Sequence, residues 1–241
     1  MKQSFITFLL LFIFSQSYSQ GFTMTYKSER LYYKDIFADA KGEVPLSEKQ
    51  KAMVNKQYHS SYSLLTLTKI SNVSRYEFVE NVNPYQKKKT KKLDIGNIWY
   101  YQKNFKTKTL KMLGGGVQEG TCTKPKKLSE LVDWQFKKGD STINTYECKK
   151  AVDKISGAVA WYTLSLSISD GPKHFSGLPG LVVLLLDEKK NEKIELTKVA
   201  KLEKEELESY ECEEEITYES YAGKKKGLQL LKKKPSVEIK K

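Results

Sequence analysis

Apolar and polar residues alternate along much of this chain. Near its start, Phe22, Met24 and Tyr26 alternate with threonine and lysine. Successive side chains of a β-strand point to opposite faces of a sheet, so this pattern predicts a strand with one apolar face. Similar segments, rich in β-branched and aromatic residues, predict further strands over 62–70, 73–82, 95–103 and 105–113.

The most regular part of the pattern lies between residues 161 and 187. Residues 162 to 169 alternate strictly between apolar and hydroxyl side chains, which predicts one strand. Residues 181 to 186 are all apolar, but they are too few to span a bilayer, so they predict a second strand that is buried on both faces.

A stiff turn is predicted between these two strands. Pro179 presets its own φ, and Gly180 after it accepts a positive φ, so the pair offers the two central residues of a type II turn. Gly177, Pro179 and Gly180 are therefore assigned a structural role.

The segments beside this region extend the sheet. Residues 131–136 and 142–152 predict a hairpin whose turn is Lys137-Lys138-Gly139-Asp140. The alternation of residues 194–197 adds one more antiparallel strand after the buried run.

Helix signals are few. Ser47 and Gln50 have the spacing of a capping box and predict a helix that ends near Tyr58. A second short helix is predicted near 202–210. The predicted fold is therefore mainly β, in the α+β class: a curved antiparallel meander sheet or half-barrel with one or two short helices.

The two ends of the chain differ from the part between them. Residues 1–19 have a basic start, an apolar core and small residues before a cleavage site, as in a signal peptide. Residues 20–222 are long enough for a single β-rich domain, and residues 223–241 form a basic tail with few apolar anchors. We therefore expect an exported monomer, periplasmic or secreted, with no transmembrane span after cleavage.

Charge and cysteine content narrow the possible partners. The formal net charge of +13 favours anionic surfaces, and export makes nucleic acid an improbable partner. Three cysteines in an oxidising compartment imply one disulfide and one free thiol. Their spacing does not identify the pair, but Cys122 with Cys148 closes the shortest loop and is the expected bond; the third cysteine is Cys212.

Candidate chemistry is confined to one loop. Asp170, His174 and Ser176 place a carboxylate, an imidazole and a hydroxyl next to the predicted turn, a set that suits acid–base catalysis or metal binding. The chain has neither a GxSxG nor an HExxH motif, and an ordinary exposed loop accounts for the same residues. We therefore assign no catalytic residue, no metal ligand and no cofactor.

An ordered series of motifs resembles a known family. Tyr146-Glu147-Cys148, Ala160-Trp161-Tyr162-Thr163, Gly171-Pro172, Phe175 and Gly177-Leu178-Pro179-Gly180-Leu181 resemble the GLPGLI family of exported Bacteroidetes proteins. The family has no assigned function, so the resemblance implies an exported β-rich protein and no catalytic residues. The sheet of the LolA-type lipoprotein carriers is the architectural analogy that it suggests.

These observations lead to one main hypothesis and two alternatives. The main one is a non-enzymatic binding protein for an apolar or anionic ligand or an envelope partner. Its candidate contacts are Trp161, Asp170, His174 and Phe175, with Trp161 on a concave face of the sheet. The alternatives are a hydrolase or metal-dependent enzyme that uses Asp170 and His174, and a structural component of the envelope.

Overall fold

The computed structural model describes residues 21–31, 46–83, 90–91, 100–113, 121–202, 207, 212–217 and 220. The predicted signal peptide and basic tail lie outside these residues, as does most of the predicted helix near 202–210. None of the described helices is long and apolar enough to cross a membrane.

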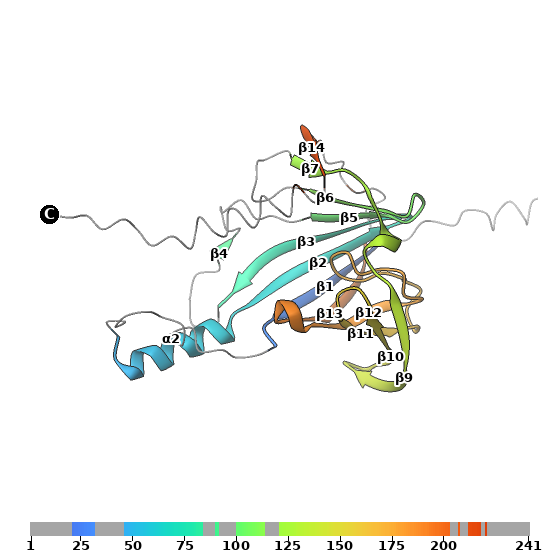
Figure 1. The fold of residues 1–241 in the computed structure, drawn as a ribbon. Coiled ribbons are helices and arrows are strands. Elements are labelled where there is room, and N and C mark those ends of the chain that lie inside the picture. The colour runs from blue at the N-terminus through green and yellow to red at the C-terminus, as the bar shows by residue number, and fades with distance from the viewer. Residues whose placement is uncertain are drawn as a thin grey trace, which may run out of the picture.

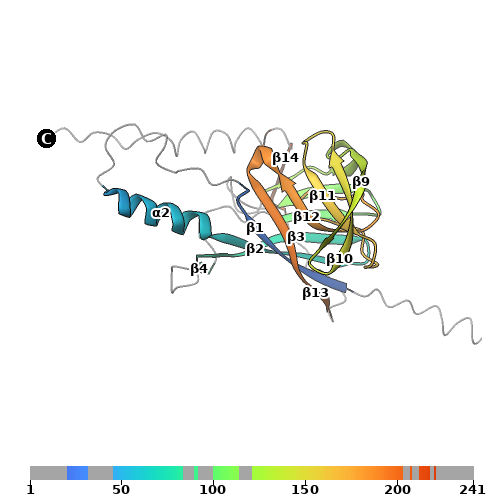
Figure 2. The same cartoon turned by 90° about the horizontal axis from the view of Figure 1, so that it is seen from below.

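One curved, open sheet makes up most of the molecule (Figures 1 and 2). Its strand order is β14-β7-β6-β5-β3-β2-β1-β13-β12-β11-β10-β9, with β4 beside β3 and β8 beside β6. All neighbouring strands are antiparallel except β14 and β7. The predicted mainly β fold with a curved antiparallel meander is therefore confirmed, while the likeness to LolA-type carriers stays a prediction.

The elements are named in chain order. The strands are β1 (Gly21–Glu29), β2 (Tyr62–Ile70), β3 (Val73–Val82), β4 (Thr90–Lys91), β5 (Tyr100–Asn104), β6 (Thr109–Leu113), β7 (Thr121–Thr123), β8 (Lys126–Lys127), β9 (Trp134–Ile143), β10 (Tyr146–Asp153), β11 (Val159–Thr163), β12 (Leu181–Asp187), β13 (Glu192–Leu202) and β14 (Glu214–Ile216). The α-helix of the described residues is α2 (Glu48–Ser60), and two short 3₁₀ turns are η1 (Leu128–Glu130) and η2 (Glu188–Lys190).

The helix begins where its capping box predicts. The Ser47 hydroxyl accepts a hydrogen bond from the Gln50 backbone N–H, and the Gln50 side chain accepts one from the Ser47 N–H. Both bonds satisfy amide groups that the first turn of a helix leaves free. The helix lies beside one end of the sheet in both views (Figures 1 and 2), so it does not itself pack on the faces of β9 to β13.

Several strands match the sequence prediction closely. β2 and β3 have the predicted bounds, β1 includes the predicted first strand, and β12 lies between β11 and β13 as a central strand. β6 begins only at Thr109, because the Asn104 side chain accepts the backbone N–H groups of Lys106 and Thr107 and bends the chain there.

The predicted turn of the β9–β10 hairpin is in the wrong place. The chain reverses at Asn144 and Thr145, which both have positive φ, and residues 137–140 lie inside β9. Asparagine tolerates the left-handed conformation that such a two-residue turn requires. Gly139, with φ +128, sits at an irregularity of the β9–β10 register and not at its end.

The predicted strand over residues 162 to 169 is half right. β11 ends at Thr163, where the Ser165 N–H donates to the Thr163 hydroxyl and bends the chain. Beyond this bend no strand forms and Leu164 is 52% exposed, although Ile168 is buried. The residues that follow form the inner loop, which we define as residues 164–180.

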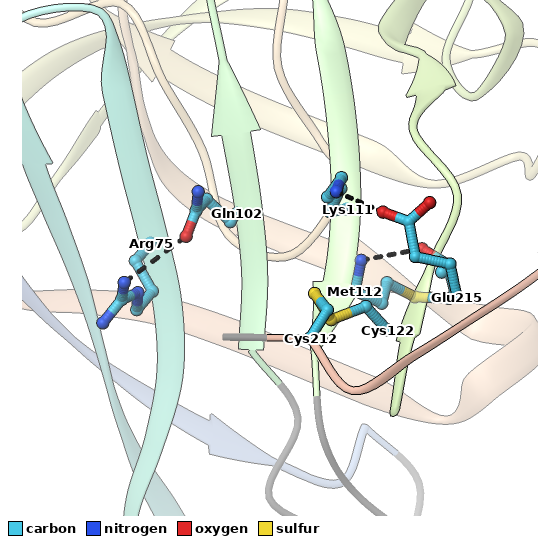
Figure 3. The surroundings of a disulfide bond; sticks show 8 residues. Arg75, Gln102, Lys111, Met112, Cys122, Cys212 and Glu215 are labelled. Atoms are coloured by element: carbon cyan, nitrogen blue, oxygen red, sulfur yellow. Dashed lines mark hydrogen bonds and ion pairs between the residues drawn. A yellow bond between two sulfur atoms is a disulfide. The ribbon is translucent and has the colours of Figure 1, made fainter. Parts of the chain in front are cut away.

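The disulfide pairs different cysteines from those expected. Cys122 bonds to Cys212 (Figure 3), and their Cα atoms are 5.7 Å apart. Cys148 is a buried free thiol. The predicted Cys122–Cys148 bond is wrong because β7 and β10 lie near opposite ends of the strand order. One disulfide and one free thiol were expected, and that count is confirmed.

Parallel pairing and an ion pair hold the disulfide segment at the sheet edge. β14 pairs with β7, and Lys111 of β6 bonds Glu215 at 2.6 Å (Figure 3). The disulfide therefore helps to hold in place a segment whose strand, β14, is only three residues long.

Loss of this bond should lower stability without changing the fold of the remaining sheet. Cys212→Ser removes a crosslink between residues 90 positions apart, which the chain-entropy account values at roughly 4 to 5 kcal/mol. Urea unfolding measures the change, and Cys148→Ala is the control because it keeps the crosslink. A non-reduced peptide map that joins Cys148 to Cys122 would contradict the assignment.

Candidate functional site

The inner face of the sheet carries the apolar core. Cross-strand rows on this face include Met24, Leu67 and Tyr76 in β1 to β3, and Ala151, Ala160, Leu185 and Ile194 in β10 to β13, all of them buried. The inner loop contacts both parts of this face. It touches β5 on one side and β9 on the other, so it lies inside the curve of the sheet.

The inner loop enters where β12 and β13 separate. β13 pairs with β12 only as far as Glu195 and continues along β1 alone. At the freed edge of β12, the Val182 N–H donates to the Asp170 carbonyl at 2.9 Å, and the Tyr26 hydroxyl donates to the Val182 carbonyl at 2.8 Å. The loop and Tyr26 thus satisfy the backbone groups of β12 that β13 does not pair with.

Two lysines of one cross-strand row hold the inner loop. Lys69 of β2 and Lys103 of β5 lie on either side of Ser74 of β3. Lys69 donates to the Ser169 carbonyl at 3.3 Å, and Lys103 donates to Asp170 Oδ1 and to the Gly171 carbonyl.

The Lys103–Asp170 pair is completely buried. Both side chains have 0% exposure, and the Gly171 N–H also donates to Asp170 Oδ1 at 2.7 Å. Burial lowers the pKa of Lys103 despite the opposing effect of Asp170. Asp170 Oδ2 is buried without a hydrogen-bond partner, as are the Ser74 and Tyr76 hydroxyls.

His174 and Phe175 lie on the other side of the loop. The centroids of their rings are 4.1 Å apart. Phe175 also packs against Trp134 of β9, and the indole N–H of Trp134 donates to the Ser176 carbonyl at 2.7 Å. Burial, followed by the positive charges of Lys190, Lys173 and Lys103, lowers the pKa of His174 to about 3. The imidazole is therefore neutral at physiological pH.

Glycines let the inner loop approach the sheet. A Cβ at Gly180 would lie 1.9 Å from the Thr163 carbonyl oxygen, and one at Gly171 would lie 2.6 Å from the Phe175 oxygen. Among the glycines of this loop, Gly177 has positive φ, at +87°, and Gly180 does not. The predicted type II turn at Pro179–Gly180 is therefore wrong; Gly180 is required for close contact and Gly177 for backbone conformation.

The loop does not present an exposed acid–base pair. Asp170 bonds Lys103 on the β5 side, while His174 packs against Phe175 on the β9 side. The described residues contain no group of three histidine, cysteine or acidic side chains that could hold a metal ion. The side-chain placement of the second histidine, His59, lies outside what the structure describes.

Trp161 lies on the outer face, apart from the inner loop. It pairs with Lys150 of β10 and Leu184 of β12, and the Lys150 ammonium is 5.1 Å from the centre of its ring. The structure therefore separates Trp161 from Asp170, His174 and Phe175, with which it was grouped. The expected concave location is wrong, because β11 presents Ala160 and not Trp161 to the inner face.

The neighbours of Trp161 on the outer face are also apolar and only half-buried. These are Val152, Val159, Leu184 and Leu186, which with Trp161 we call the outer strip. Ion pairs border it on β1 and β13, where Lys193 contacts both Glu29 and Glu195. Hydrogen bonding to Glu195 raises the pKa of Lys193, so its ammonium stays charged at neutral pH.

The sequence comparison identifies the family. Residues 47–184, more than half of the chain, match the family described as a protein of unknown function, Porph_ging. The chain belongs to the Porph_ging family. The matched residues include β11, the inner loop and the start of β12. A search of curated proteins gave no match.

The Porph_ging chain is similar in fold to part of a solved structure. Two structures titled PNGF-II, in the P21 and C2 space groups, align with a TM-score of 0.54 and identities of 16% and 17%. Each alignment covers 85% of this chain but only 33% or 32% of the PNGF-II chain. The chain thus spans about a third of that protein, and the likeness shows the fold alone.

Gly180→Ala should damage the fold far more than Gly177→Ala. The first places a methyl group against the Thr163 carbonyl, which a rotamer change cannot relieve, so unfolding should be easier by more than about 3 kcal/mol. The second only places alanine at positive φ, at a cost of about 1 kcal/mol. Thermal and urea unfolding compare the two variants; equal losses would contradict the close-contact role.

His174 should make the protein less stable in acid. The unfolded imidazole binds a proton below its ordinary pKa of 6.5, whereas the folded one does so only near 3, so stability falls as pH decreases through this window. The slope is at most about 1.4 kcal/mol per pH unit. Urea unfolding at about pH 7 and about pH 5 should show a smaller decrease for His174→Gln than for the unchanged protein. His59→Gln is the control, and an unchanged slope in His174→Gln would refute the assignment.

Proposed function

We propose that this Porph_ging protein is a non-enzymatic binding protein of the GLPGLI type, exported to the periplasm or the cell exterior. The outer strip is its binding surface. Export rests on the signal-like residues 1–19, and the GLPGLI assignment rests on the motif at residues 177–181.

The observation that supports this proposal is the half-exposed apolar strip on a regular sheet face. Five neighbouring apolar side chains from β10, β11 and β12 face outward, on the side of the sheet opposite the buried core. Contiguous exposed apolar surface bordered by polar residues is typical of an interaction site. The inner loop lies against the other face, so that face is less available to a ligand.

The chemistry of the strip favours a ligand that is apolar with an anionic part. Trp161 offers a flat aromatic surface. Lys150 pairs with it on the neighbouring strand β10, and Lys137 of β9 pairs with Lys150. Tryptophan is the residue most enriched at binding hot spots. An enzyme based on Asp170 and His174 gains no comparable support, since Asp170 is paired and buried.

The test is ligand retention by the full-length protein isolated from its own envelope. Native mass spectrometry should detect a bound molecule or partner, and Trp161→Ala with Leu184→Ser should weaken binding by at least about 2 kcal/mol, roughly 30-fold. Val79→Ser and Ile155→Ser are matched controls, because these apolar residues are 43% and 54% exposed outside the strip. No retained molecule, or equal retention by the strip variant, would overturn the proposal.

A further inference from the structure

The buried contact between Lys103 and Asp170 has the components of an amide-forming site. The Lys103 amine touches the Asp170 carboxyl group from a strand that is 67 positions away in sequence. Both side chains are fully buried. Solvent is therefore kept from the two reacting groups.

Ordinary ion pairing leaves this contact incompletely satisfied. Asp170 Oδ1 accepts from Lys103 and from the Gly171 N–H, but Oδ2 has no partner. A buried carboxylate oxygen without a donor is costly, and the desolvation of a buried ion pair often exceeds its Coulomb gain. Conversion of the pair to a neutral amide removes both charges and the unpaired oxygen.

We propose that Lys103 and Asp170 condense to an intramolecular isopeptide bond. The ammonium, which contacts Oδ1, first gives up a proton to the carboxylate. This yields a neutral amine and a neutral acid that carries its proton on Oδ2. The Nζ lone pair then attacks Cγ, and the electron pair of the Cγ–Oδ1 double bond moves to Oδ1. That pair re-forms the double bond as the Cγ–Oδ2 bond breaks, and Oδ2 leaves as water with its own proton and one from Nζ.

Neighbouring groups support the attack of the amine on the carboxyl group. The Gly171 N–H already donates to Oδ1 and stabilises the charge that develops there. The Gly171 carbonyl accepts from Nζ at 2.5 Å and holds the amine against the carboxyl group. Burial lowers the pKa of Lys103, which favours the neutral nucleophile.

The same row contains a lysine that should not react. Lys69 donates to the Ser169 carbonyl and not to a carboxyl group, and its ammonium is 3.6 Å from the centre of the Phe105 ring. Lys69→Arg is therefore a matched control, whereas Lys103→Arg keeps a positive charge but removes the nucleophile.

Mass spectrometry of the full chain decides the proposal. After the N-terminus and the disulfide are accounted for, the unfolded, reduced protein should be lighter than its sequence by one water. Trypsin should leave Lys103 uncut and release residues 93–106 joined to residues 155–173. The Lys69→Arg protein should retain this product, and the Lys103→Arg protein should lack it.

Two results would overturn the proposal. One is a wild-type mass equal to that of the unmodified sequence. The other is a loss of water confined to the peptide 155–173, with Lys103 cleaved normally, because Asp170-Gly171 can form a succinimide on its own. Both results are independent of whether the outer strip binds a ligand.

Discussion

The contact of Lys103 with Asp170 and Gly171 is the interaction on which the interior depends. It joins the inner loop to β5, while Trp134 and Phe175 join the same loop to β9. Polar groups with no access to water must find partners in the protein, so a charged side chain at this depth fixes where the loop lies. The strands on the β5 side of the curved sheet and those on the β9 side are thereby connected through the inner loop as well as through β13.

The separation of β12 from β13 explains why a loop is needed there. A strand that leaves its neighbour exposes backbone N–H and C=O groups, which must be satisfied by other means. Asp170 and Tyr26 do so for Val182, and the Asn144 amide of the β9–β10 turn donates to the Leu196 carbonyl of β13. The glycines of the loop permit this close packing, which gives the motif around Gly177 to Leu181 a physical reason that is independent of catalysis.

The strands were predictable where one face is buried and the other is not, as in β2 and β3, because burial imposes a period of two. The alternation after Thr163 was misleading, since a hydroxyl–backbone hydrogen bond ended the strand before its pattern did. Lys103 gave one signal that could have been used: in β5 it shares a face with Tyr101, which packs against the core, and a lysine at such a position implies a buried partner. Its partner was beyond prediction, because 67 positions separate the two residues.

The sequence by itself determined the local features: the helix start at Ser47, the central strand β12, the mainly β class, and one disulfide with one free thiol. Each follows from hydrogen bonding, burial or residue counting within short segments. Only the tertiary structure decided which cysteines pair, why Gly180 is glycine, and that Trp161 faces outward while Asp170 is buried against Lys103. Each of these features depends on which strands become neighbours in space. The curved sheet brings together residues that lie far apart along the chain, and no local sequence pattern encodes such contacts.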